Sequence, residues 1–215
     1  QRQMCIRDSG KVAIITGAGT IGPGVGNGKA TAVLFAREGA KVLLVDIVLE
    51  AAEETLKLIE EDGGVASTLQ ADVSNAKECE NMVETCIKRY GRLDILVNNV
   101  GISSKGDALT LDEAEWDQVM DVNVKSVVLT SRAAIPEMIK GGGGVITNLS
   151  SIAGLGMRPN QLSYGTSKAA VIALVRNLSA AVAPYVRINS VAPGLIDTDM
   201  ICLLYTSPSP RDGLL

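Results

Sequence analysis

The stretch "KVAIITGAGTIGPGVGNGKATAVLFAREGAKVLLVD", residues 11–46, decides the fold. Its first six residues are a β-branched apolar run, typical of a buried parallel strand. A glycine-rich segment follows at 17–28, then a helical pattern at 29–39 and a second apolar strand at 41–46. This order predicts a βαβ unit with its glycines at the carboxyl end of the first strand.

The rest of the chain continues the same alternation. We expect further strands at 65–72, 93–99, 144–150 and 186–193, and helices at 49–62, 74–89, 111–139 and 163–183. Ser74 is the expected N-cap of the helix at 74–89. The pattern predicts an α/β fold with a doubly wound, Rossmann-type parallel sheet in one domain, residues 10–200. Ligands of such sheets bind at the carboxyl ends of the strands.

Composition excludes several classes of function. The chain has 215 residues and a net charge of −4, so it lacks the basic surface that nucleic acid requires. No apolar run is long enough to cross a membrane. Cys5, Cys79, Cys86 and Cys202 form no CxxC pair, which argues against a zinc site and favours the reducing cytoplasm. With no histidine, the chain cannot build a Ser-His-Asp triad, and we expect no metal site.

The glycine loop has two possible registers. Gly17–Gly22 matches G-x-G-x-x-G, but a helix starting there would include Pro23 and three more glycines. Each glycine inside a helix costs about 1 kcal/mol relative to alanine. We therefore expect the helix to begin near Gly26–Gly28, after an inserted "IGPGV" at 21–25. Pyrophosphate would then bind the backbone of Gly17, Gly26, Asn27 and Gly28, although a purely structural turn is the alternative.

Asp46 supports this register. It closes the second strand about twenty residues after Gly26, where an acidic side chain binds the hydroxyls of the adenine ribose. A helix N-cap is the alternative role for an aspartate at a strand end.

Tyr164 and Lys168 lie four residues apart on a predicted helix and therefore share a face. An unperturbed tyrosine is a poor base at neutral pH, and a nearby ammonium favours its ionised form. Ser151 follows the fifth strand, where its hydroxyl can hydrogen-bond a substrate oxygen. A surface Tyr–Lys pair without function is the alternative.

Taken in order, the motifs resemble the short-chain dehydrogenase/reductase family over roughly residues 10–200. They are "TG" with the glycine loop, Asp46, "DV" at 72–73, "NNVG" at 98–101, Asn123, "SS" at 150–151, "YGTSK" at 164–168 and "PG" at 193–194. The resemblance implies an oxidoreductase that transfers a hydride between NAD and a secondary alcohol or ketone. It also implies a homo-oligomer.

The resemblance assigns a role to each matching residue. Tyr164 would be the catalytic acid/base, Lys168 would assist it and bind the nicotinamide ribose, and Ser151 would orient the substrate oxygen. Asn123 would hold a water of the proton relay, or else hydrogen-bond the backbone at a helix irregularity. Asn98 would join strands or contact cofactor. Further cofactor contacts are implied for Asp72, Val73, Asn99, Gly101, Pro193, Ile196 and Thr198.

Two rival functions remain open at this point. Sugar-nucleotide epimerases and dehydratases share Tyr-x-x-x-Lys, but they need a large C-terminal domain. The second rival is an inactive dinucleotide-binding fragment. It is suggested by the end segments 1–9 and 201–215, which share no pattern with the fold. The family's seventh strand would then be missing, and nothing in the sequence names the substrate.

Overall fold

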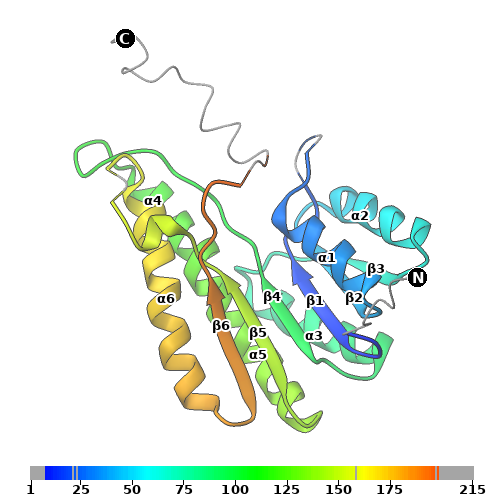
Figure 1. Ribbon diagram of the computed structural model, residues 1–215. Helices are drawn as coiled ribbons and strands as arrows, with labels where there is room; N and C mark the ends of the chain where they lie inside the picture. The colour runs from blue at the N-terminus through cyan, green and yellow to red at the C-terminus, as the bar shows by residue number, and fades with distance from the viewer. Residues whose placement is uncertain (1–7, 21, 23, 158, 197, 199–215) are drawn as a thin grey trace.

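The computed structural model describes residues 8–20, 22, 24–157, 159–196 and 198 (Figure 1). The strands are β1 (Val12–Thr16), β2 (Lys41–Asp46), β3 (Val65–Gln70), β4 (Ile95–Asn98), β5 (Gly144–Leu149) and β6 (Val186–Val191). The α-helices are α1 (Asn27–Arg37), α2 (Leu49–Glu61), α3 (Ala76–Tyr90), α4 (Glu113–Met120), α5 (Ser126–Lys140) and α6 (Leu162–Val182). A π-helix, η1 (Asp121–Lys125), joins α4 to α5, and a 3₁₀ turn, η2 (Ile152–Gly154), follows β5.

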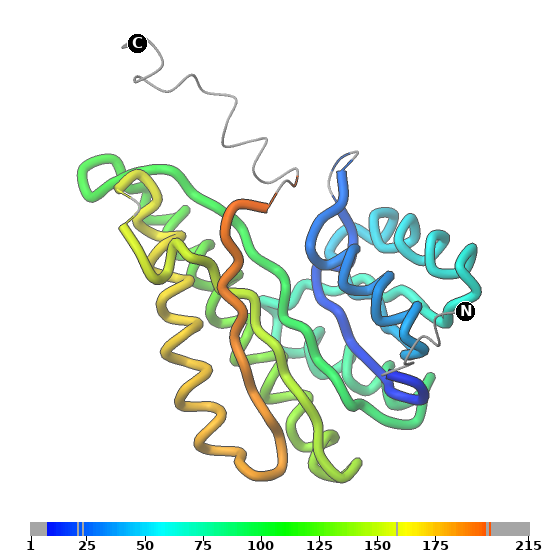
Figure 2. Tube along the Cα trace, viewed as in Figure 1, coloured from blue at the N-terminus to red at the C-terminus, as the bar shows by residue number. Residues whose placement is uncertain are grey.

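The strands form one parallel sheet in the order β3-β2-β1-β4-β5-β6. The predicted doubly wound α/β fold is therefore confirmed. The order reverses at β1, which pairs with both β2 and β4, and such a switch point opens a crevice at the carboxyl ends of the strands. Figure 2 shows that the loops after β1, β4, β5 and β6 all emerge at this edge, the upper one in the view.

Both faces of the sheet bury apolar side chains because residues alternate sides along each strand. In β1, Ile14 belongs to the cluster that packs against α3, α5 and α6, whereas Ile15 belongs to the cluster beneath α1 and α2. Ala32 and Ala36 of α1 are buried against the second face. These small side chains let α1 lie close to the sheet and so fix its N-terminus beside the end of β1.

Strand β6 lies at the edge of the sheet and pairs with β5. Val186 and Ile188 are buried, while Arg187 and Asn189 on the opposite face are exposed. The two predicted tails are 1–9 and 201–215, and of these only residues 8 and 9 belong to the part of the chain that the structure describes. The described residues form six strands, and the seventh strand of the family was expected to be missing. Of the N-terminal segment, Asp8 donates its backbone N–H to the carbonyl of Glu38.

Local signals placed most helix ends correctly. Helix α1 begins at Asn27 with Gly26 as its N-cap, as the cost of glycine inside a helix predicted. The prediction for α3 was wrong, because Asn75 is the N-cap and its side chain accepts from the N–H groups of Lys77 and Glu78. Ser74 instead donates its hydroxyl to Asp72.

Candidate active site

The glycine loop places bare backbone against the end of β4. Gly17 has φ +62°, and a Cβ on it would meet Asn99 Nδ2 at 2.9 Å. A Cβ on Gly28 would collide with the carbonyl oxygen of Gly17. No side chain of the described residues caps the N-terminus of α1 at Gly26. The first amides of α1 are therefore available to an anion, which a helix N-terminus favours.

Asp46 stabilises the same loop. Its Oδ2 accepts from Gly19 N at 2.8 Å, and its Oδ1 accepts from Val48 N at 3.1 Å. Thr20 Oγ1 accepts from Gly26 N at 3.1 Å, which closes the inserted segment. Each carboxylate oxygen has a second lone pair, so Asp46 can accept ligand hydroxyls while it holds the loop.

Asn98 and Asn99 join neighbouring strands at the switch point. Asn98 Nδ2 donates to Asn148 Oδ1 at 2.8 Å, so the strand-joining alternative describes what Asn98 does here. Asn99 Nδ2 donates to the carbonyls of Thr16 and Gly17, at 3.2 and 3.0 Å. The amide of Asn99 therefore fixes the base of the glycine loop.

Tyr164 and Lys168 lie together on the first turns of α6. Lys168 Nζ is 5.7 Å from the centroid of the Tyr164 ring, within the range of a cation–π contact. A Cβ on Gly101 would meet Lys168 Nζ at 2.9 Å, so a side chain at this point of the loop after β4 would displace the ammonium. The pair thus sits beside the switch point.

Lys168 is almost fully buried, with 4% of its surface exposed. Burial lowers the pKa of Lys168 to about 8, from an ordinary value of 10.5. The ammonium donates to the carbonyl of Leu149 at 3.0 Å, and the Lys168 carbonyl accepts from Ser150 Oγ at 2.7 Å. Two consecutive residues at the end of β5 therefore position this lysine.

Ser151 begins the η2 turn. Its Oγ accepts from Ala153 N at 3.1 Å, which fixes the rotamer of the side chain. A hydroxyl that accepts one bond still has a proton to donate and a second lone pair. Ser151 can therefore hydrogen-bond a substrate oxygen without giving up its structural bond.

Asn123 is buried in the π-helix η1. Its Oδ1 accepts from Ile102 N at 2.8 Å, and its Nδ2 donates to the Ile102 carbonyl at 2.9 Å and to Ser167 Oγ at 2.9 Å. The side chain thus hydrogen-bonds backbone at a helix irregularity, which was the alternative to a role in a water relay. π-Bulges of this kind occur frequently at functional sites.

The remaining predicted residues lie on loops at the same edge. Asp72 Oδ1 accepts from Ser74 N and Oγ, at 2.8 and 2.7 Å, and Asp72 N donates to Glu78. Val73 is buried. The carbonyl of Pro193 accepts from Ile152 N at 3.0 Å, and Ile196 is 43% exposed. Thr198 is half-buried.

Sequence reasoning missed Gly154. A Cβ on Gly154 would lie 2.6 Å from the backbone of Lys168 and Ala169, so only glycine lets η2 rest on α6. The glycine was visible in the sequence, but its contact joins residues far apart in the chain. It also missed Ser104, Ser163 and Ser167, whose hydroxyls bond across segments that share no local pattern.

Other side-chain chemistry in the described residues is limited. Burial raises the pKa of Cys79 to about 11 and that of Cys86 to about 12, so neither thiol is a ready nucleophile at neutral pH. Cys5 and Cys202 lie outside the described residues. No group of three or more acidic or cysteine side chains in the described part could hold a metal ion. None of its helices is long and apolar enough to cross a bilayer.

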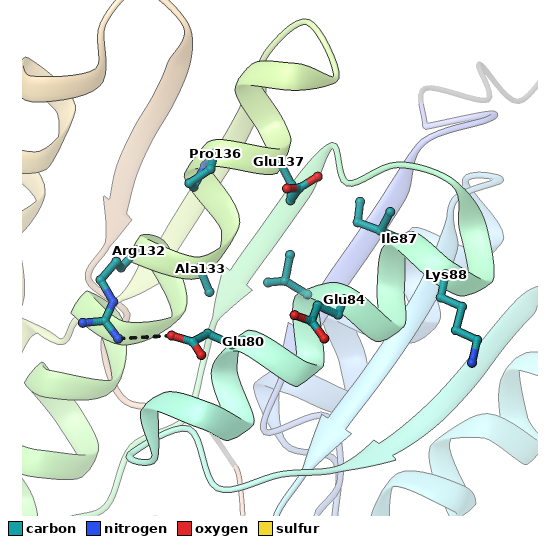
Figure 3. A pocket seen from close by; sticks show the side chains of 9 residues that line it. Glu80, Glu84, Ile87, Lys88, Arg132, Ala133, Pro136 and Glu137 are labelled. Carbon is teal, nitrogen blue, oxygen red and sulfur yellow. Dashed lines mark ion pairs between the residues drawn. The ribbon is translucent and has the colours of Figure 1, made fainter.

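A pocket of about 540 Å³ lies between α3 and α5 (Figure 3). It is lined by Glu80, Val83, Glu84, Ile87, Lys88, Arg132, Ala133, Pro136 and Glu137. Arg132 and Glu80 form an ion pair across it, at 3.6 Å. None of the predicted site residues lines this pocket.

A family model described as short chain dehydrogenase matches residues 11–205. The chain belongs to the short-chain dehydrogenase family. It is 43% identical, over 95% of its length and 80% of the relative's, to an uncharacterized oxidoreductase of Thermotoga maritima. It is 38% identical to a 3-oxoacyl-acyl-carrier-protein reductase of that organism, covering 91% and 78% of the two chains. It is 37% identical to a cyclopentanol dehydrogenase of Comamonas, covering 97% and 82%.

Solved structures agree with this assignment. A family member from Burkholderia xenovorans superposes with a TM-score of 0.90 at 41% identity, covering 93% of this chain and 80% of that one. A 7α-hydroxysteroid dehydrogenase in complex with NADH and 7-oxo glycochenodeoxycholic acid superposes with a TM-score of 0.87 at 36% identity. The match covers 96% of this chain and 78% of that one. This chain is therefore an oxidoreductase of the short-chain dehydrogenase type.

Proposed function

We propose that this chain interconverts a secondary alcohol and a ketone with NAD, using Tyr164 as the acid/base. The observation that carries the proposal is the Tyr164–Lys168 pair, with its buried ammonium 5.7 Å from the ring centroid at the carboxyl edge of the sheet. A phenol beside a fixed ammonium is a group that can exchange a proton with a substrate oxygen.

The cofactor site is proposed from the glycine loop. The pyrophosphate lies against the backbone of Gly17, Gly26, Asn27 and Gly28 at the N-terminus of α1, and the adenine ribose hydroxyls bond Asp46. Adenine contacts Asp72 and Val73, and the cleft continues along Asn99 and Gly101. Pro193, Ile196 and Thr198 flank the nicotinamide. The NADH in the hydroxysteroid dehydrogenase structure supports this choice of cofactor.

In the proposed reaction the nicotinamide, when bound, accepts or supplies the hydride. Tyr164 removes the hydroxyl proton of the alcohol, or returns it to the ketone oxygen. Ser151 donates a hydrogen bond to that oxygen as its charge changes. Lys168 assists Tyr164 and binds the nicotinamide ribose. Asn123 has both side-chain N–H groups engaged, so a water of the proton relay can bind it only at the second lone pair of Oδ1.

The substrate class rests on the relatives as well as on the site. Cyclopentanol is a secondary alcohol, and 7-oxo glycochenodeoxycholic acid carries a ketone. The relatives named above are oxidoreductases, which favours this chemistry over epimerisation or dehydration. By the same resemblance we propose that the protein is a homo-oligomer, which sedimentation would test.

The test is Tyr164→Phe, assayed for NAD-linked oxidation across a panel of secondary alcohols. We expect turnover to be abolished and NAD affinity to be nearly unchanged, because the ring still packs and only the transferable proton is lost. Lys168→Ala should reduce both. Tyr185→Phe is the matched control, because Tyr185 is 62% exposed and lies just before β6. Substantial activity in Tyr164→Phe would remove Tyr164 from the mechanism, and NAD binding by the parent chain without turnover would favour the inactive-fragment alternative.

A further inference from the structure

The loop between β4 and α4 crosses the edge of the sheet to the start of α6. Gly106 N donates to the Asn160 carbonyl at 3.0 Å, and Leu162 N donates to the Gly106 carbonyl at 3.2 Å. These bonds make a parallel bridge between Gly106 and Gln161. Gly106 has φ +124°, a conformation that side-chain-bearing residues rarely adopt.

The bridge caps the N-terminus of α6 with a backbone carbonyl. Gln161, the N-cap of α6, makes no side-chain cap bond, and the early N–H groups of a helix have no partner within the helix. The Gly106 carbonyl supplies one for Leu162. Beside it, Ser104 and Ser163 share a hydrogen bond of 2.7 Å between their Oγ atoms, with 3% and 1% of their surfaces exposed. The loop thus fixes the residue immediately before Tyr164.

A second set of bonds joins the same loop to the residues after Tyr164. Asn123 bonds Ile102 N and O with its amide and donates to Ser167 Oγ. Ser167 Oγ in turn donates to the carbonyl of Tyr164 at 2.7 Å. The first turn of α6 is therefore held on both sides of Tyr164, whereas Lys168 is held separately by Leu149, at the end of β5, and by Ser150.

We propose that Ser104 is a positioning residue, which sets the orientation of Tyr164 toward Lys168 through its hydrogen bond to Ser163. The inference rests on the proposed function, since it assumes that Tyr164 is the acid/base. Helix geometry brings the two residues to one face of α6, but the loop after β4 holds the start of the helix while Leu149 and Ser150 hold Lys168. The orientation of the ring toward the ammonium therefore depends on both sets of bonds. Small displacements of reacting groups cost large factors in rate.

Ser104→Ala tests this role because it leaves Ser163 buried with no hydroxyl to bond. Ser103→Ala is the matched control: its Oγ is buried in the same loop and has no hydrogen-bond partner among the described residues. Ser104→Thr keeps a hydroxyl and serves as the rescue variant, and Ser163→Ala removes the same bond from the other side.

The readout is the placement of the Tyr164 ring beside the Lys168 side chain, followed by NMR on the 215-residue chain with labelled tyrosine rings. The chain has four tyrosines, and Tyr164→Phe identifies the signal of interest. We expect Ser104→Ala and Ser163→Ala to lose the nuclear Overhauser effect between the Tyr164 ring and the Lys168 ε-methylene, because the ring loses its fixed approach to the ammonium. Hydrogen exchange at 159–166 should become at least about tenfold faster. Ser103→Ala should change neither, and Ser104→Thr should restore both.

An unchanged Overhauser effect between Tyr164 and Lys168 in both Ser104→Ala and Ser163→Ala would overturn the positioning role, whatever their melting temperatures. This result is distinct from a failure of the proposed function. In that case Tyr164→Phe would retain turnover, while the NMR spectrum would still report whether the loop controls the ring.

Discussion

Ser150 Oγ donates a 2.7 Å hydrogen bond to the backbone carbonyl of Lys168. The next residue toward the N-terminus, Leu149, accepts from the ammonium of the same lysine. Lys168 is therefore bound at its backbone and at the tip of its side chain by the last residue of β5 and the residue that follows it. Its charge is held in place before any ligand binds, which is the condition for electrostatic assistance without reorganisation.

We predict that Ser150→Ala lowers the free energy of unfolding by about 1 kcal/mol, the contribution of one buried hydrogen bond. Urea unfolding followed by circular dichroism measures this value. Ser179→Ala is the control, because Ser179 on α6 also donates to a backbone carbonyl but lies in an exposed position. Equal losses in the two variants would contradict a special role for the Ser150 bond.

The burial of Lys168 predicts a pH-dependent stability. Its pKa is about 8 in the folded chain and near the ordinary 10.5 when unfolded, so the unfolded chain binds more protons between these values. The contribution of Lys168 to the free energy of unfolding should therefore rise with pH from about 8 to 10.5. If Lys168→Met is more stable than the parent chain at pH 7, this difference in the free energy of unfolding should disappear as the pH rises through that window.

Parallel urea titrations from pH 7 to 10.5 would measure this difference. Lys57→Met, on the exposed face of α2, is the control and should show no such trend. A constant difference between Lys168→Met and the parent chain across this range would show that the lysine is not desolvated.

Sequence patterns predicted the elements because apolar periodicity and glycine are local signals. Strand β2 runs over 41–46 as expected, and α1 begins where interior glycines cease to be costly. Local signals failed where two neighbouring residues suit the same role. Ser74 and Asn75 are both good N-caps, and the choice depends on Asp72, whose carboxylate accepts the Ser74 hydroxyl.

The candidate site was predicted as a set of residues but not as a set of contacts. The spacing of Tyr164 and Lys168 on one helix indicated their proximity, because helix geometry fixes it. The bond between Ser104 and Ser163 joins positions 59 residues apart, and no periodicity records such a pair. The π-helix at Asn123 was likewise expected only as a possible irregularity within 111–139.

Asp94 should stabilise the amino end of the sheet at neutral pH and lose that effect in acid. Burial alone raises its pKa, but hydrogen bonds from Arg92 and Val12 N, with the charge of Lys11, more than offset this and hold the pKa below its ordinary range. A depressed carboxyl pKa stabilises the folded state above the unfolded pKa of about 4, and the effect is lost as pH falls through the folded value.

Asp94→Asn should therefore cost about 1–3 kcal/mol at pH 7, and the cost should shrink as the pH falls below about 4. Unfolding curves at pH 7 and at stepwise lower pH test the prediction. Asp62→Asn breaks the exposed ion pair with Arg37 and should cost less than about 1 kcal/mol. A larger loss of unfolding free energy in Asp62→Asn than in Asp94→Asn would contradict the stabilising role of Asp94.

Asp46 should make the chain prefer NAD to NADP. Its carboxylate lies at the end of β2, fixed by Gly19 N and Val48 N, where a 2′-phosphate would meet like charge. Ile47 and Val48 are exposed beside it and offer no cation to bind such a phosphate. Calorimetric titration with both cofactors should show tighter NAD binding in the parent chain and a reduced ratio in Asp46→Asn. Glu50→Gln removes the same charge from the exposed first turn of α2 and should leave the ratio unchanged. Tighter binding of NADP by the parent chain would contradict the assignment of Asp46 to the ribose. If Glu50→Gln lowered the ratio of NAD to NADP affinity as much as Asp46→Asn does, the preference would come from general charge repulsion and not from a ribose contact.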